Sequence, residues 1–144
     1  MAKPTAITIQ IFRVPAQRVY DAILDPDMIA KFMFGPLLRE ETILHIRADA
    51  RVGGRFSYRV RRGETEIDHV GKFLELDRPN RIVFTWAIAG EGEDDPSIVT
   101  IDITPRPDGC SLRLTHEMDE KWAEFVDRSQ AGWEKMFGVL ATLL

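Results

Sequence analysis

Apolar and polar side chains alternate along the segment 69–86, where two strand-like runs are joined by Asp77-Arg78-Pro79-Asn80. A period of two residues is typical of a β-strand with unlike faces. Proline suits the second position of a tight turn, and asparagine tolerates unusual dihedral angles. The pattern predicts a β-hairpin near the middle of a sheet. One face of its second strand is large and apolar, formed by Ile82, Phe84, Trp86 and Ile88.

Shorter alternating runs predict further strands on both sides of this hairpin. The first covers residues 5–13, with isoleucines at 7, 9 and 11 on one face, and the next covers 43–47. Paired glycines at 53–54 and the segment 105–109 predict turns. Inward-facing rows are expected at Phe56, Tyr58 and Val60, at Val99, Ile101 and Ile103, and at Leu112, Leu114 and His116.

Helical spacing follows the first strand and returns at the C-terminus. Pro15 suits the first turn of a helix, and Asp25-Pro26 predicts the start of a second short helix that runs to about Met33. From Asp119 the spacing predicts one long helix of about six turns. Gly132 lies within it and would allow a neighbouring element to come close. The apolar positions of this helix are Trp122, Phe125, Val126, Trp133, Met136, Leu140 and Leu143.

This order of elements predicts an α+β fold, in which helices cover one face of an antiparallel sheet. The C-terminal helix is the only element with enough apolar surface to cover the face of Phe84 and Trp86. We therefore expect it to lie across the concave side of the sheet.

Composition narrows the class of protein. A chain of 144 residues with 44% hydrophobic and 29% charged residues predicts one globular domain, 1–144. The net charge of -4 gives no general attraction to nucleic acid or to an anionic membrane. A single cysteine, Cys110, rules out an internal disulfide. With no signal-peptide pattern and no apolar run of ~20 residues, a cytoplasmic location is the expectation.

The histidines His45, His69 and His116 are the first candidates for chemistry. They lie on different predicted strands without the spacing of zinc ligands, so we expect no metal site. His116 belongs to an inward row, where it could act as a general base or be held structurally by hydrogen bonds. No serine lies in a hydrolase motif. The sequence therefore predicts no catalytic residue and no cofactor.

The predicted hairpin carries a second candidate, Glu75, which lies close in sequence to Arg78 and Arg81. A carboxylate there could brace the hairpin or, as an alternative, take part in catalysis. A β-bulge at Gly71 could shift the register and so change the direction of the side chains between Gly71 and Leu76. The acidic loop 90–95 lacks the pattern of a phosphate or calcium site and predicts a solvated turn.

The aromatic side chains of the sheet and the last helix could fill a solid core or line a pocket for an apolar ligand. For the second alternative we expect one group of lining residues. It consists of Phe32, Phe56, Tyr58, Phe73, Phe84, Trp86, His116, Phe125, Trp133 and Met136.

Several motifs in this order resemble one known family. They are V-P-A-Q-R-V-Y-D-A-I-L-D-P-D near the start, Gly35-Pro36, G-G-R-F at 53–56, residues 71–86, L-R-L-T-H at 112–116 and Gly132-Trp133-Glu134. The chain resembles the START-like superfamily (SRPBCC, helix-grip, birch-pollen-allergen-like), in the bacterial branch named after homologues of the heat-shock-protein ATPase activator. One departure is that Phe32, Met33 and Phe34 occupy the place where such proteins often carry a tryptophan.

The resemblance implies a curved seven-stranded antiparallel sheet around the long C-terminal helix, two short helices after the first strand, and a cavity between sheet and helix. Relatives bind lipids, hormones or polyketides, and others are enzymes or chaperone-linked modules. Our leading hypothesis is a non-enzymatic module that binds a small hydrophobic molecule. The alternatives are a chaperone-linked or regulatory protein-binding module of the stress response and a cyclase- or dehydratase-like enzyme using His116 with Tyr58 or Asp102. An exposed edge of the sheet could also support a homodimer.

Overall fold

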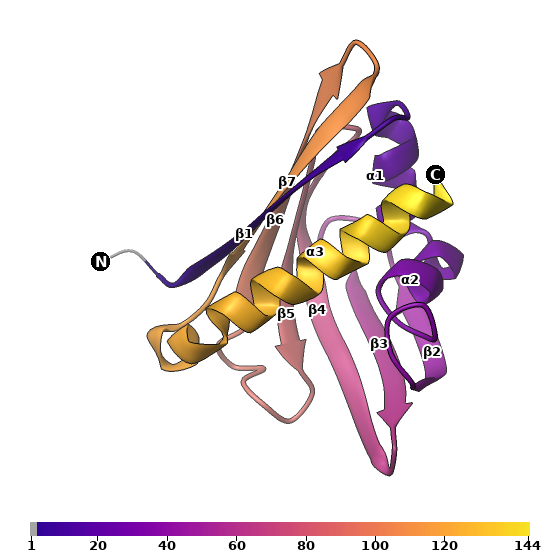
Figure 1. Ribbon diagram of the computed structural model, residues 1–144. Helices are drawn as coiled ribbons and strands as arrows, with labels where there is room; N and C mark the ends of the chain where they lie inside the picture. The colour runs from indigo at the N-terminus through magenta and orange to yellow at the C-terminus, as the bar shows by residue number, and fades with distance from the viewer. Residues whose placement is uncertain (1–2) are drawn as a thin grey trace.

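Seven strands form one antiparallel sheet in the order β1-β7-β6-β5-β4-β3-β2. The structure is a computed structural model and describes residues 3–144. Figure 1 shows α3 crossing one face of the sheet, with α1 and α2 beside its C-terminal half. The predicted α+β helix-grip fold is confirmed. The elements are β1 (Thr5–Phe12), α1 (Ala16–Leu24), α2 (Pro26–Phe32), β2 (Thr42–Ala48), β3 (Arg55–Arg62), β4 (Thr65–Asp77), β5 (Arg81–Ile88), β6 (Ser97–Arg106), β7 (Gly109–Glu117), the 3-10 helix η1 (Glu120–Phe125) and α3 (Val126–Leu143).

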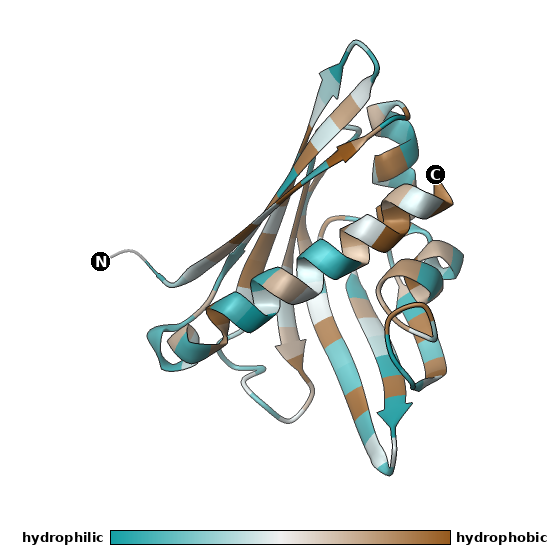
Figure 2. Ribbon diagram, viewed as in Figure 1, coloured by the Kyte–Doolittle hydropathy of each residue, from teal (hydrophilic) through white to brown (hydrophobic). Residues whose placement is uncertain are grey.

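The alternation of apolar and polar residues along the strands, visible in Figure 2, puts one face of the sheet against the helices. The inward rows of β6 and β7 are buried, as the sequence predicted. From α3, the buried side chains are Trp133, Phe137 and Leu140. Each large apolar side chain buried in this way contributes roughly 1.5–3 kcal/mol. Phe137 was not among the predicted apolar positions of the helix but is buried, whereas Met136, which was among them, is only partly buried.

The central hairpin consists of β4 and β5, and Ile82 and Phe84 point into the core as predicted. Its turn is closed by the Asn80 amide, which donates to the Asp77 carbonyl at 2.7 Å. Pro79, joined to Arg78 by a cis peptide bond, is therefore the third residue of the turn, whereas the sequence suggested the second.

The pairing of β4 with β5 shifts between Phe73 and Glu75, so the irregularity follows Gly71 instead of lying at it. Gly71 has a different role. A Cβ atom built there would overlap the Thr85 carbonyl oxygen and the ring of Phe56. Glycine is thus required because two neighbouring groups approach the backbone closely.

The isoleucines of β1 share one face, as expected, but it is the outer face of an edge strand. Ile9 is 62% exposed, while Ala6, Thr8 and Phe12 are buried. Small and aromatic residues, and not the isoleucines, join the first strand to the core.

The C-terminal segment differs from the single long helix that we predicted. Asp119 caps the start, since its Oδ1 accepts from the Lys121 amide at 3.0 Å, but the first turns are the 3-10 helix η1. Short 3-10 stretches are frequent at helix N-termini. The expected close approach at Gly132 is also wrong, because a Cβ there would meet nothing within 4 Å. No helix within residues 3–144 combines the length and apolar character needed to cross a bilayer.

Candidate functional site

The space between the middle of the sheet and α3 is almost completely filled. It leaves an enclosed volume of about 20 Å³, near the size of one water molecule. The Phe56 ring lies 4.7 Å from that of Tyr58 and 5.7 Å from that of Phe84, between centroids. The structure places six of the predicted lining residues around this small space: Phe32, Phe56, Tyr58, Phe73, Phe84 and Trp133.

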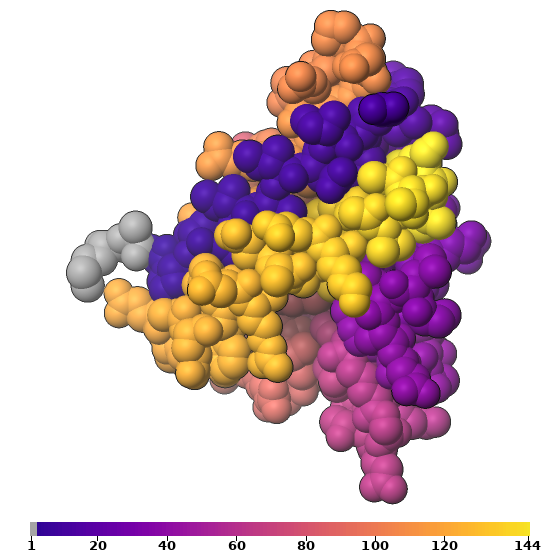
Figure 3. Space-filling model, in the orientation of Figure 1, coloured from indigo at the N-terminus to yellow at the C-terminus, as the bar shows by residue number. Residues whose placement is uncertain are grey.

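The other four predicted residues lie together with Trp133, which borders both spaces, in an open groove of about 500 Å³. This groove runs between the end of the sheet near the β5–β6 loop and the segment formed by η1 and the first half of α3. Figure 3 shows the surface hollowed between α3 and the strands drawn in pink. The apolar wall of the groove includes Trp86, Phe125, Trp133 and Met136, and His116 lies at the base of the groove. We call it the open-end groove.

His116 is held by a chain of hydrogen bonds that fixes its protonation. The Trp133 Nε1–H donates to His116 Nδ1 at 3.1 Å, so the neutral ring carries its proton on Nε2. That Nε2–H donates to Ser97 Oγ at 2.7 Å, and the Ser97 hydroxyl donates to the Trp86 carbonyl at 2.9 Å. Burial lowers the pKa of His116 to about 4. Both ring nitrogens are therefore engaged, and the ring is neutral at physiological pH.

His69 also borders the groove and is only 7% exposed. Its Nδ1 lies 3.0 Å from the Tyr58 carbonyl, which can only accept, so Nδ1 carries the proton. Burial lowers the pKa of His69, although the hydrogen bond to Tyr58 acts in the opposite direction. The neutral ring consequently keeps Nε2 as a hydrogen-bond acceptor. The ring lies 4.9 Å from that of Phe34 and 5.4 Å from that of Trp86 between centroids, and both pairs are tilted.

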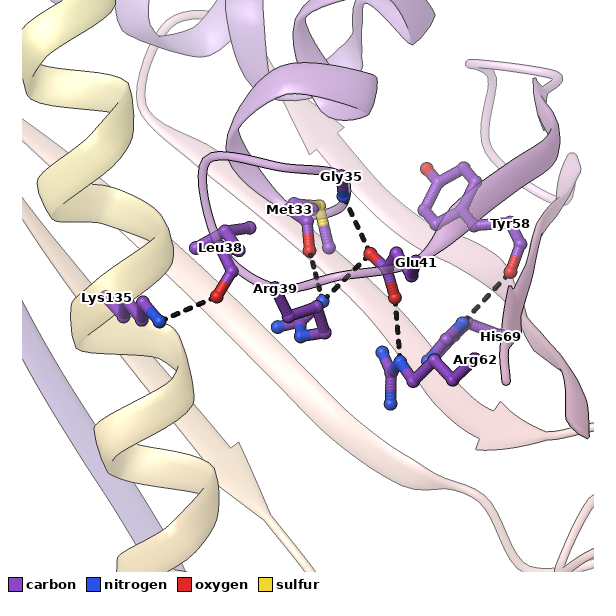
Figure 4. Close-up of polar contacts among 9 residues, drawn as sticks. All are labelled: Met33, Gly35, Leu38, Arg39, Glu41, Tyr58, Arg62, His69 and Lys135. Atoms are coloured by element: carbon purple, nitrogen blue, oxygen red, sulfur yellow. Dashed lines mark hydrogen bonds and ion pairs between the residues drawn. The ribbon is translucent and has the colours of Figure 1, made fainter. Parts of the chain in front are cut away.

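Next to His69 lies a buried carboxylate that the sequence analysis missed (Figure 4). The Glu41 side chain is completely buried. Its Oε2 accepts from the Gly35 amide at 2.7 Å and from Arg39 Nη1 at 3.2 Å, and its Oε1 accepts from Arg62 Nε at 2.7 Å. Burial alone would raise the pKa of Glu41, but the hydrogen bonds from Arg62 and Gly35 and the charges of both arginines outweigh it, so the pKa is lowered.

Glu41 joins the loop after α2 to the end of β3, and α3 is fixed to the same loop by Lys135 Nζ, which donates to the Leu38 carbonyl at 2.7 Å. The sequence offered no signal for this role, because Glu41 belongs to no apolar row and its partners are brought to it only by the fold. Arg62, held in this way, reaches the lining of the open-end groove.

Comparison with known proteins gives the family. Residues 13–144 match the sequence profile described as "Activator of Hsp90 ATPase homolog 1-like protein". The chain belongs to this family. The predicted membership of its bacterial branch, within the START-like superfamily, is thereby confirmed. No curated protein sequence matches the chain.

Solved structures of bacterial proteins share the fold over nearly the whole chain. A Chromobacterium violaceum protein is 27% identical, with a TM-score of 0.79 over 97% of this chain and 96% of that one. A Nitrosomonas europaea protein is 18% identical, with a TM-score of 0.82 over 100% of this chain and 96% of that one. An AHSA1-like protein from Aeromonas hydrophila is 22% identical, with a TM-score of 0.78 over 96% and 90%. The last two show likeness of fold alone.

Within this family fold, the side chains suggested for an enzyme are not brought together. Asp102 alternates with the buried Ile101 and Ile103, so it lies on the opposite face of the sheet from His116, and its Oδ1 accepts from Arg81 Nη1 at 3.2 Å. Tyr58 lies in the filled core. Among residues 3–144, no three histidine, cysteine or acidic side chains converge as metal ligands.

The contacts of the remaining candidate residues favour a structural role over a catalytic one. Glu75 Oε2 lies 3.2 Å from Arg81 Nε in an exposed ion pair of the hairpin, the bracing role that the sequence suggested. Such pairs contribute little to stability. Cys110 is buried, and burial raises its pKa, which leaves the thiol protonated. Two residues of the acidic loop, Glu91 and Asp95, form part of the rim of the open-end groove.

Proposed function

We propose that this chain binds a small hydrophobic molecule and that the open-end groove is its binding site. The observation that carries the proposal is the contrast between the filled core and this groove. Its volume of about 500 Å³ lies within the roughly 300–1,000 Å³ usual for small-molecule sites, and its wall is predominantly apolar and aromatic. The bound molecule would lie against the indoles of Trp86 and Trp133, whose centroids are 5.5 Å apart.

The arrangement supports binding without catalysis. General acid–base chemistry needs a group that can exchange a proton at the working pH. His116 is neutral with both nitrogens occupied, and Tyr58, the other polar group suggested for the enzyme alternative, is directed into the core. The proton of His69 is held by a backbone carbonyl.

Two glycines of α3 provide a matched test. Gly132 lines the groove, Gly138 does not, and a Cβ at either position meets nothing within 4 Å. We expect Gly132→Leu to fill the groove and weaken binding of the neutral probe N-phenyl-1-naphthylamine at least about tenfold, whereas Gly138→Leu leaves binding unchanged. Both variants gain helix propensity of about 1 kcal/mol, so a loss of binding cannot come from a weaker helix.

Probe fluorescence and thermal shift would measure the effect. Equal probe binding by the two leucine variants would place the site elsewhere. Absence of binding by the unaltered chain, for this probe and for a panel of lipids, aromatic compounds and polyketide-like compounds, would refute the function.

A protein-binding role is the second candidate, favoured by the exposed row of Ile7, Ile9 and Ile11 on the outer face of β1. This row lies on the other side of the sheet from the groove, so the two functions can be separated. Binding of a bacterial Hsp90, followed by calorimetry with and without a saturating groove ligand, would test it. Lack of any heat of binding would remove this candidate.

A further inference from the structure

The open-end groove has a charged corner that its apolar wall does not explain. Arg62 extends from the end of β3 into the lining, beside His69. Only its Nε is bonded to Glu41, at 2.7 Å, and the side chain remains 36% exposed. A guanidinium presents five N–H donors in a planar fork, so the terminal nitrogens of Arg62 keep donors that can reach a ligand.

The charges around this corner do not balance. Glu41 carries one negative charge and meets two arginines, Arg39 and Arg62, while the neighbouring His69 is neutral. This leaves one positive charge in excess. Across the groove, Arg128 has no carboxylate within 4.0 Å among residues 3–144.

The acidic residues of the groove lie at its rim. Asp95 is 3.8 Å from Lys121 Nζ, which offsets its charge, and Glu91 belongs to the exposed β5–β6 loop. The inner corner is therefore the positive part of the groove, and the indoles form the apolar part.

From this arrangement we infer that the ligand is an amphipathic carboxylate, whose anionic head is bound by the Arg62 guanidinium and whose flat or aliphatic body lies against Trp86 and Trp133. The inference rests on the proposed function and specifies its ligand. Glu41 is a positioning residue here. Because its buried carboxylate fixes Arg62 from behind, the fork is already oriented, and binding costs less side-chain entropy. Neutral His69 adds an acceptor for a hydroxyl group on the ligand.

Two naphthalene compounds with the same body test the inference on the unaltered chain. At pH about 7.5, naphthalene-2-carboxylate should displace N-phenyl-1-naphthylamine at least about tenfold more tightly than naphthalene-2-carboxamide, since hydrogen bonds to charged groups are the stronger ones. Added salt should reduce this preference by weakening the carboxylate and not the amide. Equal affinities for the two compounds would overturn the inference.

Variants then assign the preference to Arg62. Removing Arg62 alone would leave the buried Glu41 short of a partner, so the test variant is the pair Arg62→Gln with Glu41→Gln, which keeps neutral hydrogen-bonding groups at both positions. We expect it to lose the preference while still binding the amide. Arg62→Lys keeps the charge without the fork and should retain an intermediate preference. Arg59→Gln is the matched control, because this exposed arginine of β3 pairs with Glu66 at 2.9 Å and does not line the groove.

The outcomes separate the two proposals. If neither naphthalene compound, nor the neutral probe, nor any member of the panel binds, the proposed function fails. If the neutral probe and the amide bind and the carboxylate shows no advantage, or if the advantage survives in a folded double variant, the function stands and the assignment of the anionic head to Arg62 is wrong. Circular dichroism of each variant establishes that it is folded.

Discussion

Stability should decrease in mild acid because of His116. In the folded chain, burial lowers the pKa of this imidazole to about 4, against 6.5 for the ordinary side chain. Between these values the unfolded chain takes up a proton that the folded chain refuses, so acid favours unfolding. The contribution is fully present above the unfolded pKa and is lost as the pH falls toward the folded one.

The size of the effect follows from the two pKa values. Proton linkage for a single site shifted from 6.5 to about 4 predicts that the free energy of unfolding falls by about 2 kcal/mol between about pH 7.5 and pH 5. Burial lowers the pKa of His69 as well, so its contribution has the same sign. Carboxylates with lowered pKa values, such as Glu41, lose their contribution only at more acidic pH.

The substitution that isolates this effect is His116→Gln. A glutamine can accept from Trp133 Nε1 and donate to Ser97 Oγ, as the neutral imidazole does at 3.1 and 2.7 Å, but it cannot be protonated. Urea unfolding followed by circular dichroism at several pH values would give the free energy of unfolding. We expect the variant to lose most of the decrease toward pH about 5.

The matched control is His45→Gln, which removes an imidazole that is hydrogen-bonded to Ser57 at 2.8 Å, outside the core. Parallel profiles of stability against pH for the unaltered chain and His116→Gln would refute the inference that His116 is buried in its neutral form. A proton NMR titration of the His116 ring would report its pKa directly.

Two further substitutions test the packing. Gly71→Ala should destabilise the chain by about 1–3 kcal/mol, since the added methyl group overlaps the Thr85 carbonyl and the Phe56 ring, whereas Gly132→Ala enters open space and should stabilise by about 1 kcal/mol. Equal midpoints of urea unfolding for both would contradict the close approach at Gly71. Trp133→Ala should lower the free energy of unfolding by about 3–5 kcal/mol, because it removes a buried indole and the hydrogen-bond donor to His116. An unchanged melting curve would contradict the packing of α3 against the sheet.

Prediction from the sequence worked where one local period decides the outcome. The row of Ile82, Phe84 and Trp86 shows a strand with one large apolar face, and alternation after the turn at 105–109 placed His116 on the inside. It worked less well in the C-terminal helix. Met136 and Phe137 are adjacent and both apolar, and only the way in which α3 packs on the sheet puts Phe137 in the core and Met136 at the groove.

The position of the candidate site did not follow from the sequence. The sequence left open whether the aromatic residues fill a solid core or line one pocket, and the rings of Phe56, Tyr58 and Phe84 pack against one another and leave about 20 Å³. Whether a set of rings closes on itself or leaves a void depends on distances between segments far apart in the chain. The same holds for Glu41 and Arg62, separated by two strands in sequence and joined by a bond of 2.7 Å.

By itself the sequence determined the order of the elements, the apolar faces of the strands and most of the secondary structure, because these follow from the period of the side chains along each segment. Only the tertiary structure decided that the space between the sheet and α3 is filled, that the groove opens beside Trp86 and Trp133, and that Arg62 and His69 meet at the inner corner of the groove. The physical reason is that void volume, burial and the pairing of charges depend on how surfaces from distant segments fit together, and no local pattern encodes that fit.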